Sequence, residues 1–232
     1  KFAPLVALGD FSLPNNSYLT SIVIGPEIRH IGKWVFNNCQ ALREFKVDPA
    51  NKWFKSVDGV LYTIDGKELV AYPEARGYKS KEFAKSGDKA WVPYDSYKIH
   101  EGVTKIWYYA FYKVDTLTNV TFPSTLKEIG EMAFWTCYGL ASLKLNEGLE
   151  VIEKDAFSYD VNLAGNIVFP STLRSIGDFA FSKDAKITGF TFNMTKTQFD
   201  ERGIAAEAYR WNYRTGASRE SQLKFLAEQS VR

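Results

Sequence analysis

The sequence predicts an α/β fold rich in β-structure: a right-handed solenoid built on a parallel sheet. Two observations carry this prediction. A phenylalanine recurs with a step of 23 or 24 residues, each copy followed six residues later by a short apolar strand. A nine-residue word, Phe-Pro-Ser-Thr-Leu-x-x-Ile-Gly, occurs at 122–130 and again at 169–177. Such a period marks a solenoid, because no single repeat can bury its apolar face alone.

Two columns of residues set the register of the repeat. The phenylalanine column contains Phe36, Phe111, Phe134, Phe157 and Phe181. The isoleucine column contains Ile31, Ile106, Ile129, Ile152 and Ile176. Steps between the phenylalanines are 75, 23, 23 and 24 residues. The long step predicts one repeat of 23 residues plus 52 inserted residues, which we place at about 48–99.

Each repeat divides into two extended parts and a turn. The first part is an alternating run, such as 117–122, which favours a strand of about five residues. The second is a shorter extended stretch at 126–129, followed by glycine and by one helical or 3₁₀ turn that directs Ala133 and Phe134 inward. One strand at the same place in every repeat predicts about six strands that pair in parallel.

The inserted segment contains a hairpin signal. Asp65-Gly66 lies between two apolar runs, which is the pattern of a type I′ turn. We expect strands near 59–64 and 67–72. We also expect the hairpin to pack on one flank of the solenoid through Trp53, Phe54, Leu61 and Tyr72.

The two ends of the chain differ from the repeats. Leu5 to Leu13 fit the second half of a repeat, so we expect Lys1 to lie inside a repeat and not at the natural start. After Phe192 the repeat stops. We therefore expect the solenoid over 1–192 and a helical C-terminal cap over 193–232.

The expected cap consists of two helices. The first runs from Asp200 to Trp211, with Ile204, Ala208 and Trp211 on one face. The second is capped by Ser218 and bears Leu223, Leu226 and Ala227.

The two cysteines share one column of the repeat. Cys39 and Cys137 are separated in that column by Val114, so we expect them two coils apart. At about 4.8 Å per coil they would lie roughly 9–10 Å apart. A disulfide requires Cα atoms within about 7 Å. The register therefore predicts two free, buried thiols.

Composition and motifs exclude several functions. The formal charge is 29 − 27 = +2 without a Lys/Arg run, which argues against nucleic acid as a partner. No stretch approaches 18 apolar residues, so the sequence predicts no membrane-spanning segment. His30 and His100 have no ligands at metal-binding spacing, and we interpret both as surface or turn residues. Without a nucleophile or nucleotide-binding motif, we expect no catalytic residues and no cofactor.

Several words resemble one known family. They are Leu-Thr-Ser-Ile-Val-Ile at 19–24, Ile-Gly at 31–32 and 129–130 with the following Phe and Cys, and Asp-Gly-Val-Leu-Tyr at 58–62. Over residues 2–192 the chain resembles the BspA-like leucine-rich repeats of bacterial cell-surface proteins. The resemblance implies a leucine-rich-repeat solenoid, secretion to the cell surface or the extracellular space, and partners such as host matrix proteins or other cells.

One aromatic patch departs from the core pattern. Tyr112 and Trp135 both follow a buried phenylalanine, and on adjacent coils they should lie partly exposed and about 5 Å apart. Trp107, Tyr108 and Tyr138 lie nearby in register, so these five residues are the candidate ligand-binding site. The patch could stack on a sugar, anchor a protein loop, or merely shield the core. The sheet face is small and mildly basic: Val23, Lys46, Thr121, Lys144, Val168 and Thr191.

The sequence thus predicts a monomeric, non-enzymatic recognition module, extracellular or on the cell surface, for protein–protein interaction or adhesion. Glycan binding through the aromatic patch is the first alternative. A structural spacer that displays a neighbouring domain is the second. The partner, an extracellular protein or a glycan, has no signature in these residues.

Overall fold

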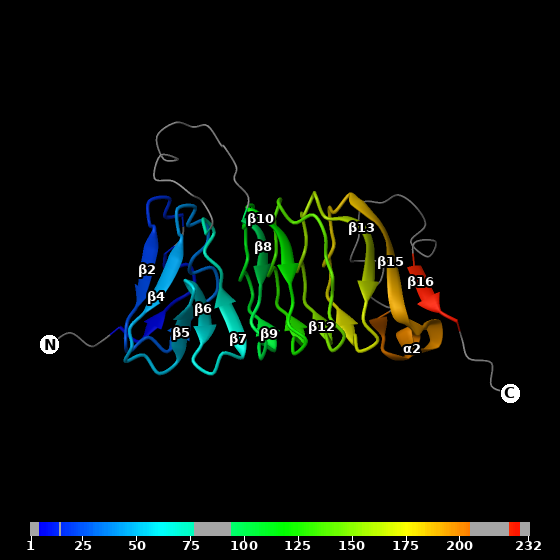
Figure 1. Cartoon of the computed structure of the whole chain (residues 1–232), viewed down its shortest axis with the longest axis horizontal. Helices are drawn as coiled ribbons and strands as arrows, with labels where there is room; N and C mark the ends of the chain where they lie inside the picture. Colours follow the sequence, from blue (N-terminus) through cyan, green and yellow to red (C-terminus); the bar gives the residue numbers. More distant parts are fainter. Residues whose placement is uncertain (1–4, 14, 77–93, 205–222, 228–232) are drawn as a thin grey trace.

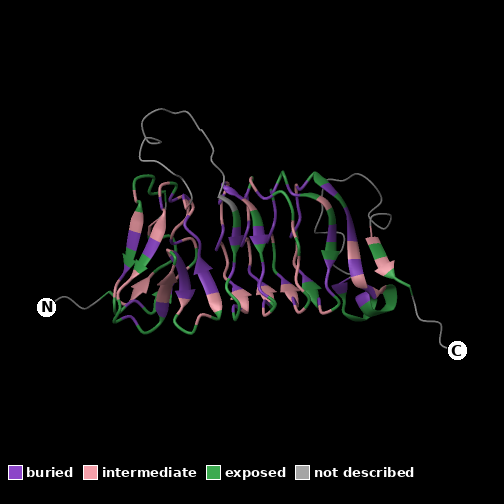
Figure 2. Cartoon of the chain, viewed as in Figure 1, coloured by how far each residue is buried: buried purple, intermediate pink, exposed green. Residues whose placement is uncertain are grey.

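The coils stack into an elongated solenoid (Figure 1). The structure, a computed structural model, describes residues 5–13, 15–76, 94–204 and 223–227. β2 lies near one end of the stack and β16 near the other. Buried residues occur in every coil from β2 to α2 (Figure 2). The solenoid architecture predicted from the repeat is therefore confirmed, with a mostly parallel sheet.

The long strands form one face, which we call the long-strand face. They pair in parallel as β2–β4, β8–β10 and β13–β15–β16. Between β10 and β13 the chain continues the row through backbone bonds from Ala141 N to Thr118 O (3.0 Å) and from Ala164 N to Ala141 O (3.1 Å). The strands are β2 (Ser21–Ile24), β4 (Glu44–Val47), β8 (Tyr94–Lys98), β10 (Leu117–Thr121), β13 (Ala164–Phe169), β15 (Lys186–Thr195) and β16 (Leu223–Leu226).

Two-residue strands form a second face, the short-strand face. Each ends on a residue of the isoleucine column or its equivalent, and Ile106, Ile129 and Ile152 have no exposed surface. Neighbours pair in parallel, for example Ile129 with Ile106 and Ile152. The strands are β1 (Ala7–Leu8), β3 (His30–Ile31), β9 (Lys105–Ile106), β11 (Glu128–Ile129), β12 (Val151–Ile152) and β14 (Ser175–Ile176).

The third side, the turn face, differs from the expected helical or 3₁₀ turn. Its residues form turns, with two non-glycine residues per coil in the left-handed region of φ. In one coil these are Tyr109 and Lys113, whose amides donate to the next coil at Glu131 O and Trp135 O, both at 3.1 Å. A helix would direct its amides along its own axis. The left-handed residues direct them to the neighbouring coil, and these hydrogen bonds offset the backbone strain.

The phenylalanine column forms a continuous stack through the core. Ring centroids lie 4.6 Å apart for Phe111 and Phe134, 5.1 Å for Phe134 and Phe157, and 5.3 Å for Phe157 and Phe181. The rings are within 11° of parallel. This spacing is close to the roughly 4.8 Å between paired strands, so ring stacking and backbone pairing reinforce each other.

The expectation that the inserted segment packs on a flank of the solenoid is wrong. Its strands β5 (Phe54–Val57), β6 (Val60–Thr63) and β7 (Glu68–Ala71) are antiparallel, and β7 then pairs in parallel with β9. Leu69 thereby occupies a place in the isoleucine column, opposite Ile106. The segment supplies a coil of the solenoid.

The reason is that the inserted strands are apolar on both faces. Val60, Tyr62, Leu69 and Tyr72 belong to the core of the C-terminal coils. Phe54, Leu61, Val70 and Ala71 belong to the core of the N-terminal coils. The ring of Tyr72 stacks on Phe111 at 4.9 Å and so extends the phenylalanine stack. The inserted sheet is the layer that joins the two cores. β8, inside the predicted insertion at 48–99, is an ordinary long strand.

The C-terminal region departs from the predicted pair of helices. A short helix, α2 (Lys196–Glu201), begins after Thr195 with a capping box to Gln198. Leu223–Leu226 is strand β16 and not a helix, because its alternate side chains pack on the end of the core: Phe225 stacks on Phe192 at 5.4 Å. Ala208, Trp211 and Ser218, assigned to the predicted helices, lie outside the described residues.

Both cysteines are buried free thiols in the predicted column. Cys39 Sγ donates to Leu13 O (3.4 Å) and Cys137 Sγ donates to Phe111 O (2.9 Å). Each acceptor lies 26 residues earlier, in the preceding coil. Cys39 belongs to the core of the N-terminal coils and Cys137 to the core of the C-terminal coils.

Two aspartates continue the cysteine column. Asp160 and Asp184 have no exposed surface. Asp160 Oδ1 accepts from Cys137 N and Asp184 Oδ1 accepts from Asp160 N, both at 2.8 Å. Each Oδ2 is buried without a hydrogen-bond partner in the described part of the chain. Burial raises the pKa of Asp184 to about 9 and that of Asp160 well above its usual range. Both are therefore neutral acids near pH 7.

A neutral buried acid makes stability fall as pH rises. Because the pKa of Asp184 is higher in the folded than in the unfolded chain, its contribution is complete below pH 4 and is lost as pH rises toward about 9. We expect Asp184→Asn to make the free energy of unfolding decrease less steeply as pH rises. Between pH 5 and 8 the unfolding free energy of the variant should fall by about 1–4 kcal/mol less than that of the wild type, measured by urea denaturation.

Asp65→Asn is the matched control. Hydrogen bonds from the Lys67 amide and the Thr63 hydroxyl lower the pKa of this exposed residue. Its contribution is therefore constant above pH 5. Parallel pH profiles for the wild type and Asp184→Asn would contradict the assignment of Asp184 as a neutral acid.

The joining role of the inserted layer is tested by Tyr72→Ala. The substitution removes a ring that is 5% exposed and that ends the aromatic stack. We expect a loss of about 3–5 kcal/mol in unfolding free energy. Trp53→Ala, at a ring 37% exposed, should cost less than about 2 kcal/mol. Equal losses in urea denaturation would show that Tyr72 is not part of a shared core.

Candidate recognition surface on the turn face

Six aromatic side chains form a row on the turn face, which we call the aromatic strip. Their positions follow from the turn. Four members are left-handed residues, Phe11, Trp34, Tyr109 and Tyr159, and the other two, Tyr112 and Trp135, directly follow a buried phenylalanine. The strip consists of Phe11, Trp34, Tyr109, Tyr112, Trp135 and Tyr159.

The predicted pair of Tyr112 and Trp135 lies at the centre of the strip. Their rings stack with centroids 5.4 Å apart and planes 26° apart. Both residues are half-buried. Their predicted adjacency, at about 5 Å, is confirmed. On the far side Trp135 meets Tyr159 edge-on at 6.1 Å.

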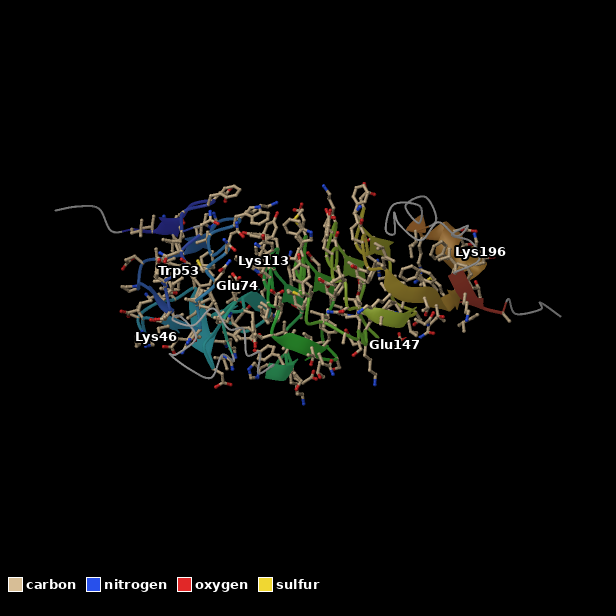
Figure 3. All side chains as sticks on the ribbon, turned by 90° about the horizontal axis from the view of Figure 1, so that it is seen from above. Lys46, Trp53, Glu74, Lys113, Glu147 and Lys196 are labelled. Carbon is tan, nitrogen blue, oxygen red and sulfur yellow. The ribbon has the colours of Figure 1, made fainter. Side chains whose placement is uncertain are left out.

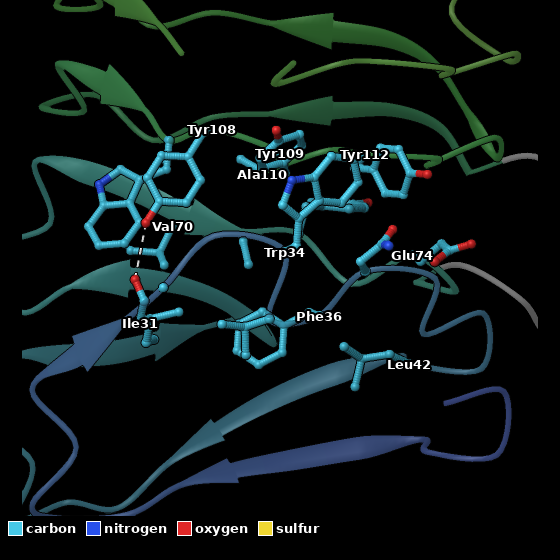
Figure 4. A pocket seen from close by; sticks show the side chains of 16 residues that line it. Ile31, Trp34, Phe36, Leu42, Val70, Glu74, Tyr108, Tyr109, Ala110 and Tyr112 are labelled. Carbon is cyan, nitrogen blue, oxygen red and sulfur yellow. Dashed lines mark hydrogen bonds between the residues drawn. The ribbon is translucent and has the colours of Figure 1, made fainter. Parts of the chain in front are cut away.

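Trp34 connects the N-terminal coils to this pair. The centroid of its ring lies 3.9 Å from that of Tyr109, and the ring meets Tyr112 edge-on at 5.2 Å (Figure 4). It also stacks on Phe11 at 6.0 Å. The sequence analysis did not assign Phe11, Trp34 or Tyr109 to a site. The signal was present, because all three share the register position two residues before the phenylalanine column.

The inserted coil is short on the turn face, which explains how Trp34 can contact Tyr109 and Tyr112 on its far side. Ile106 and Phe111 are five residues apart, whereas their counterparts Leu69 and Tyr72 are three apart. The inserted coil therefore lacks the residues that build the turn, and Trp34 covers the gap. A cavity of about 50 Å³ remains, with Phe36 and Glu74 among its lining residues (Figure 4). That is room for a water molecule and not for a sugar ring.

The other three predicted ligand residues have different surroundings. Trp107 Nε1 donates to Glu68 Oε2, and its ring packs against both cores. Tyr108 donates its hydroxyl proton to Ile31 O at 3.1 Å (Figure 4). These two residues attach the inserted strand and the N-terminal coils to the rest of the solenoid. Tyr138 is 44% exposed and lies three residues after Trp135 in the same coil.

Charge at the strip is modest. Burial raises the pKa values of Tyr109 and Tyr112 to about 12, so both hydroxyls stay neutral. Burial raises the pKa of Glu74 to about 7, and the nearby Lys113 opposes that shift (Figure 3). Lys113 lies over the Tyr112 ring at 5.4 Å. The strip is an apolar row with polar hydroxyls and a few charges at its edge.

Within the described residues, no group of three or more His, Cys, Asp and Glu side chains could hold a metal ion. His30 is exposed, and His100 meets the Tyr62 ring edge-on at 5.7 Å. None of the described helices has the length and apolar character needed to cross a membrane.

Solved structures with similar folds are bacterial repeat proteins. The pneumococcal vaccine antigen PcpA has a TM-score of 0.71 and 24% identity, over 82% of this chain and 43% of that chain. A leucine-rich cell-surface protein from Faecalibacterium prausnitzii has a TM-score of 0.60 and 22% identity, over 84% and 53%. A leucine-rich repeat protein from Eubacterium ventriosum has a TM-score of 0.52 and 16% identity, over 92% and 64%. At these identities the likeness shows the fold alone, and the chain spans about half the length of the first two.

The family comparison agrees with the fold. No curated protein matches the sequence. The family model of the BspA type leucine-rich repeat region matches in six copies, over residues 4–56 and 90–206. The gap in the match, 57–89, includes the inserted strands β6 and β7. The chain belongs to the BspA-type leucine-rich-repeat family.

Proposed function

We propose that this protein is a non-enzymatic recognition module, extracellular or on the cell surface, and that it binds a protein partner through the aromatic strip. One observation carries the proposal: aromatic rings from successive coils contact one another in a row that reaches solvent. Phe11 is 58% exposed and Tyr159 is 41% exposed. The partner class implied by the family resemblance is host matrix protein or the surface of another cell.

The shape and chemistry of the strip favour a protein partner. Trp and Tyr are enriched among the residues that dominate protein–protein binding energy. The cavity beside Trp34, Tyr109 and Tyr112 measures about 50 Å³, whereas small-molecule sites are typically several times larger. A row of half-buried rings is preorganised, which lowers the entropic cost of binding. The surface character of the Faecalibacterium relative supports the proposed localisation.

Glycan binding receives less support from the same geometry. A sugar stacks on an open ring face. Both faces of Trp34 are approached by rings, Phe11 on one side and Tyr109 on the other. Tyr112 and Trp135 cover one face of each other. A spacer function, the other alternative, would need no exposed aromatic row.

The test is binding of wild-type protein to a panel of purified extracellular-matrix proteins, with Trp135→Ala and Tyr159→Ala as strip variants. We expect each variant to lower affinity by roughly tenfold or more, because central aromatic residues contribute most of the energy. Because the Tyr159 ring is exposed, Tyr159→Ala should leave the fold intact, so a loss of affinity in this variant cannot be attributed to misfolding. The dissociation constants would be measured by biolayer interferometry.

Tyr18→Ala is the matched control. Tyr18 is 91% exposed and lies outside the strip, so its loss should leave affinity unchanged. No binding across a broad panel would refute protein recognition and favour the spacer. A glycan-array signal that Trp135→Ala abolishes would assign the strip to glycans instead.

A further inference from the structure

The charges of this solenoid are distributed unequally between its faces. On the short-strand face three cations have carboxylate partners: Lys105 pairs with Glu128 at 2.8 Å, and Lys127 and Arg174 pair with Glu150 at 3.3 and 3.2 Å. Arg29 and Lys67, at the register position of Lys127 and Arg174, have no ion pair among the described residues. On the long-strand face Lys98, Lys144 and Lys224 have no ion pair with any carboxylate among the described residues. All three are exposed.

The three lysines lie on one line along the solenoid. Strand register places Lys98 opposite Thr121, and Lys224 opposite Thr191. Lys144 lies one repeat after Thr121 and one before Val168, which pairs with Thr191. The row therefore reads Lys98, Thr121, Lys144, Val168, Thr191 and Lys224. At about 4.8 Å per strand, successive lysines lie roughly 10 and 14 Å apart.

The residues between the lysines are uncharged, and the nearest carboxylates along the described chain, Glu101 and Glu147, lie at the end of the long strands, where they accept from Ser124 and Ser171. A second exposed row beside them consists of Ser96, Asn119, Ser142 and Asn166. Asn166 Nδ2 donates to Thr191 Oγ1 at 3.0 Å, so amide and hydroxyl groups of the two rows already interact. Neither row contains a carboxylate in these coils. In contrast, Lys46, on the other side of the inserted layer, pairs with Glu44 at 2.9 Å.

We propose that the long-strand face from β8 to β16 binds an extended acidic polysaccharide. Lysines without counter-charges attract an anion, and their arrangement in a line matches a polymer that lies along the solenoid axis. Amides and hydroxyls between the lysines can donate to and accept from sugar hydroxyls. This surface is separate from the aromatic strip.

The experiment measures binding of the full chain to polygalacturonate, a linear uronic acid polymer, with uncharged dextran and poly-L-glutamate as comparisons. We expect binding to polygalacturonate that weakens about tenfold or more between 25 and 300 mM salt, because exposed charges are screened. The triple variant Lys98→Gln, Lys144→Gln, Lys224→Gln should lose roughly 10–100-fold in affinity at low salt.

A charge-matched control separates this face from net charge. Lys105→Gln, Lys127→Gln, Arg174→Gln removes the same charge from the short-strand face and should change affinity less than about twofold. Circular dichroism would establish that both triple variants fold. Absence of polygalacturonate binding, or equal losses in the two triple variants, would overturn the proposal. Tighter binding to poly-L-glutamate would overturn the polysaccharide assignment in favour of an acidic polypeptide. Trp135→Ala should leave polygalacturonate binding intact, which distinguishes this site from the aromatic strip.

Discussion

Every coil of this protein must lie within backbone hydrogen-bonding distance of the next, and that spacing constrains the rest of the structure. Stacked phenylalanine rings at 4.6–5.3 Å fit it from inside. The Ile-Gly word follows from it as well. A Cβ at Gly130 would lie 2.7 Å from Ile106 O, and a Cβ at Gly177 would lie 2.3 Å from Lys154 N. Glycine is required because the preceding coil already occupies that space.

The same spacing explains why the best-matched words lie two coils apart. Ser124 donates its hydroxyl to Glu101 at 3.0 Å, and Thr125 donates to Val103 O at 2.8 Å. In the later copy, Ser171 donates to Glu147 and Thr172 donates to Leu149 O, at 3.1 and 2.8 Å. Coils with Pro-Ser-Thr-Leu thus alternate with coils that present Glu-Gly. The period of one coil determines the fold. The alternation of Glu-Gly and Pro-Ser-Thr-Leu, with a period of two coils, determines which coils can form these hydrogen bonds with each other.

Sequence reasoning succeeded where the period applies and failed where it is interrupted. Register alone predicted the isoleucine and phenylalanine columns and the contact of Tyr112 with Trp135. The hairpin strands expected near 59–64 and 67–72 correspond to β6 and β7, but their position inside the stack was not predicted, because an apolar hairpin does not reveal what covers each face. Trp34 was missed for the same reason, since the 75-residue step concealed its closeness to Tyr109. Leu223 and Leu226 fit one helical face, but four residues are too few to distinguish a helix from a strand.

The interruption in the repeat also produces the most distinctive surface. The inserted coil passes from Leu69 to Tyr72 without turn residues. Trp34 therefore contacts its register equivalent Tyr109, although the two are 75 residues apart, and it also contacts Tyr112 and Trp135. The proposed recognition surface and the packing of the solenoid are therefore coupled at Trp34, which contacts rings from both sides of the inserted layer. They separate at Tyr159, whose ring is exposed and meets the strip only through Trp135 among the described rings. It follows that substitutions at the exposed end of the strip, such as Tyr159, should affect stability less than substitutions at Trp34, which is packed among several rings.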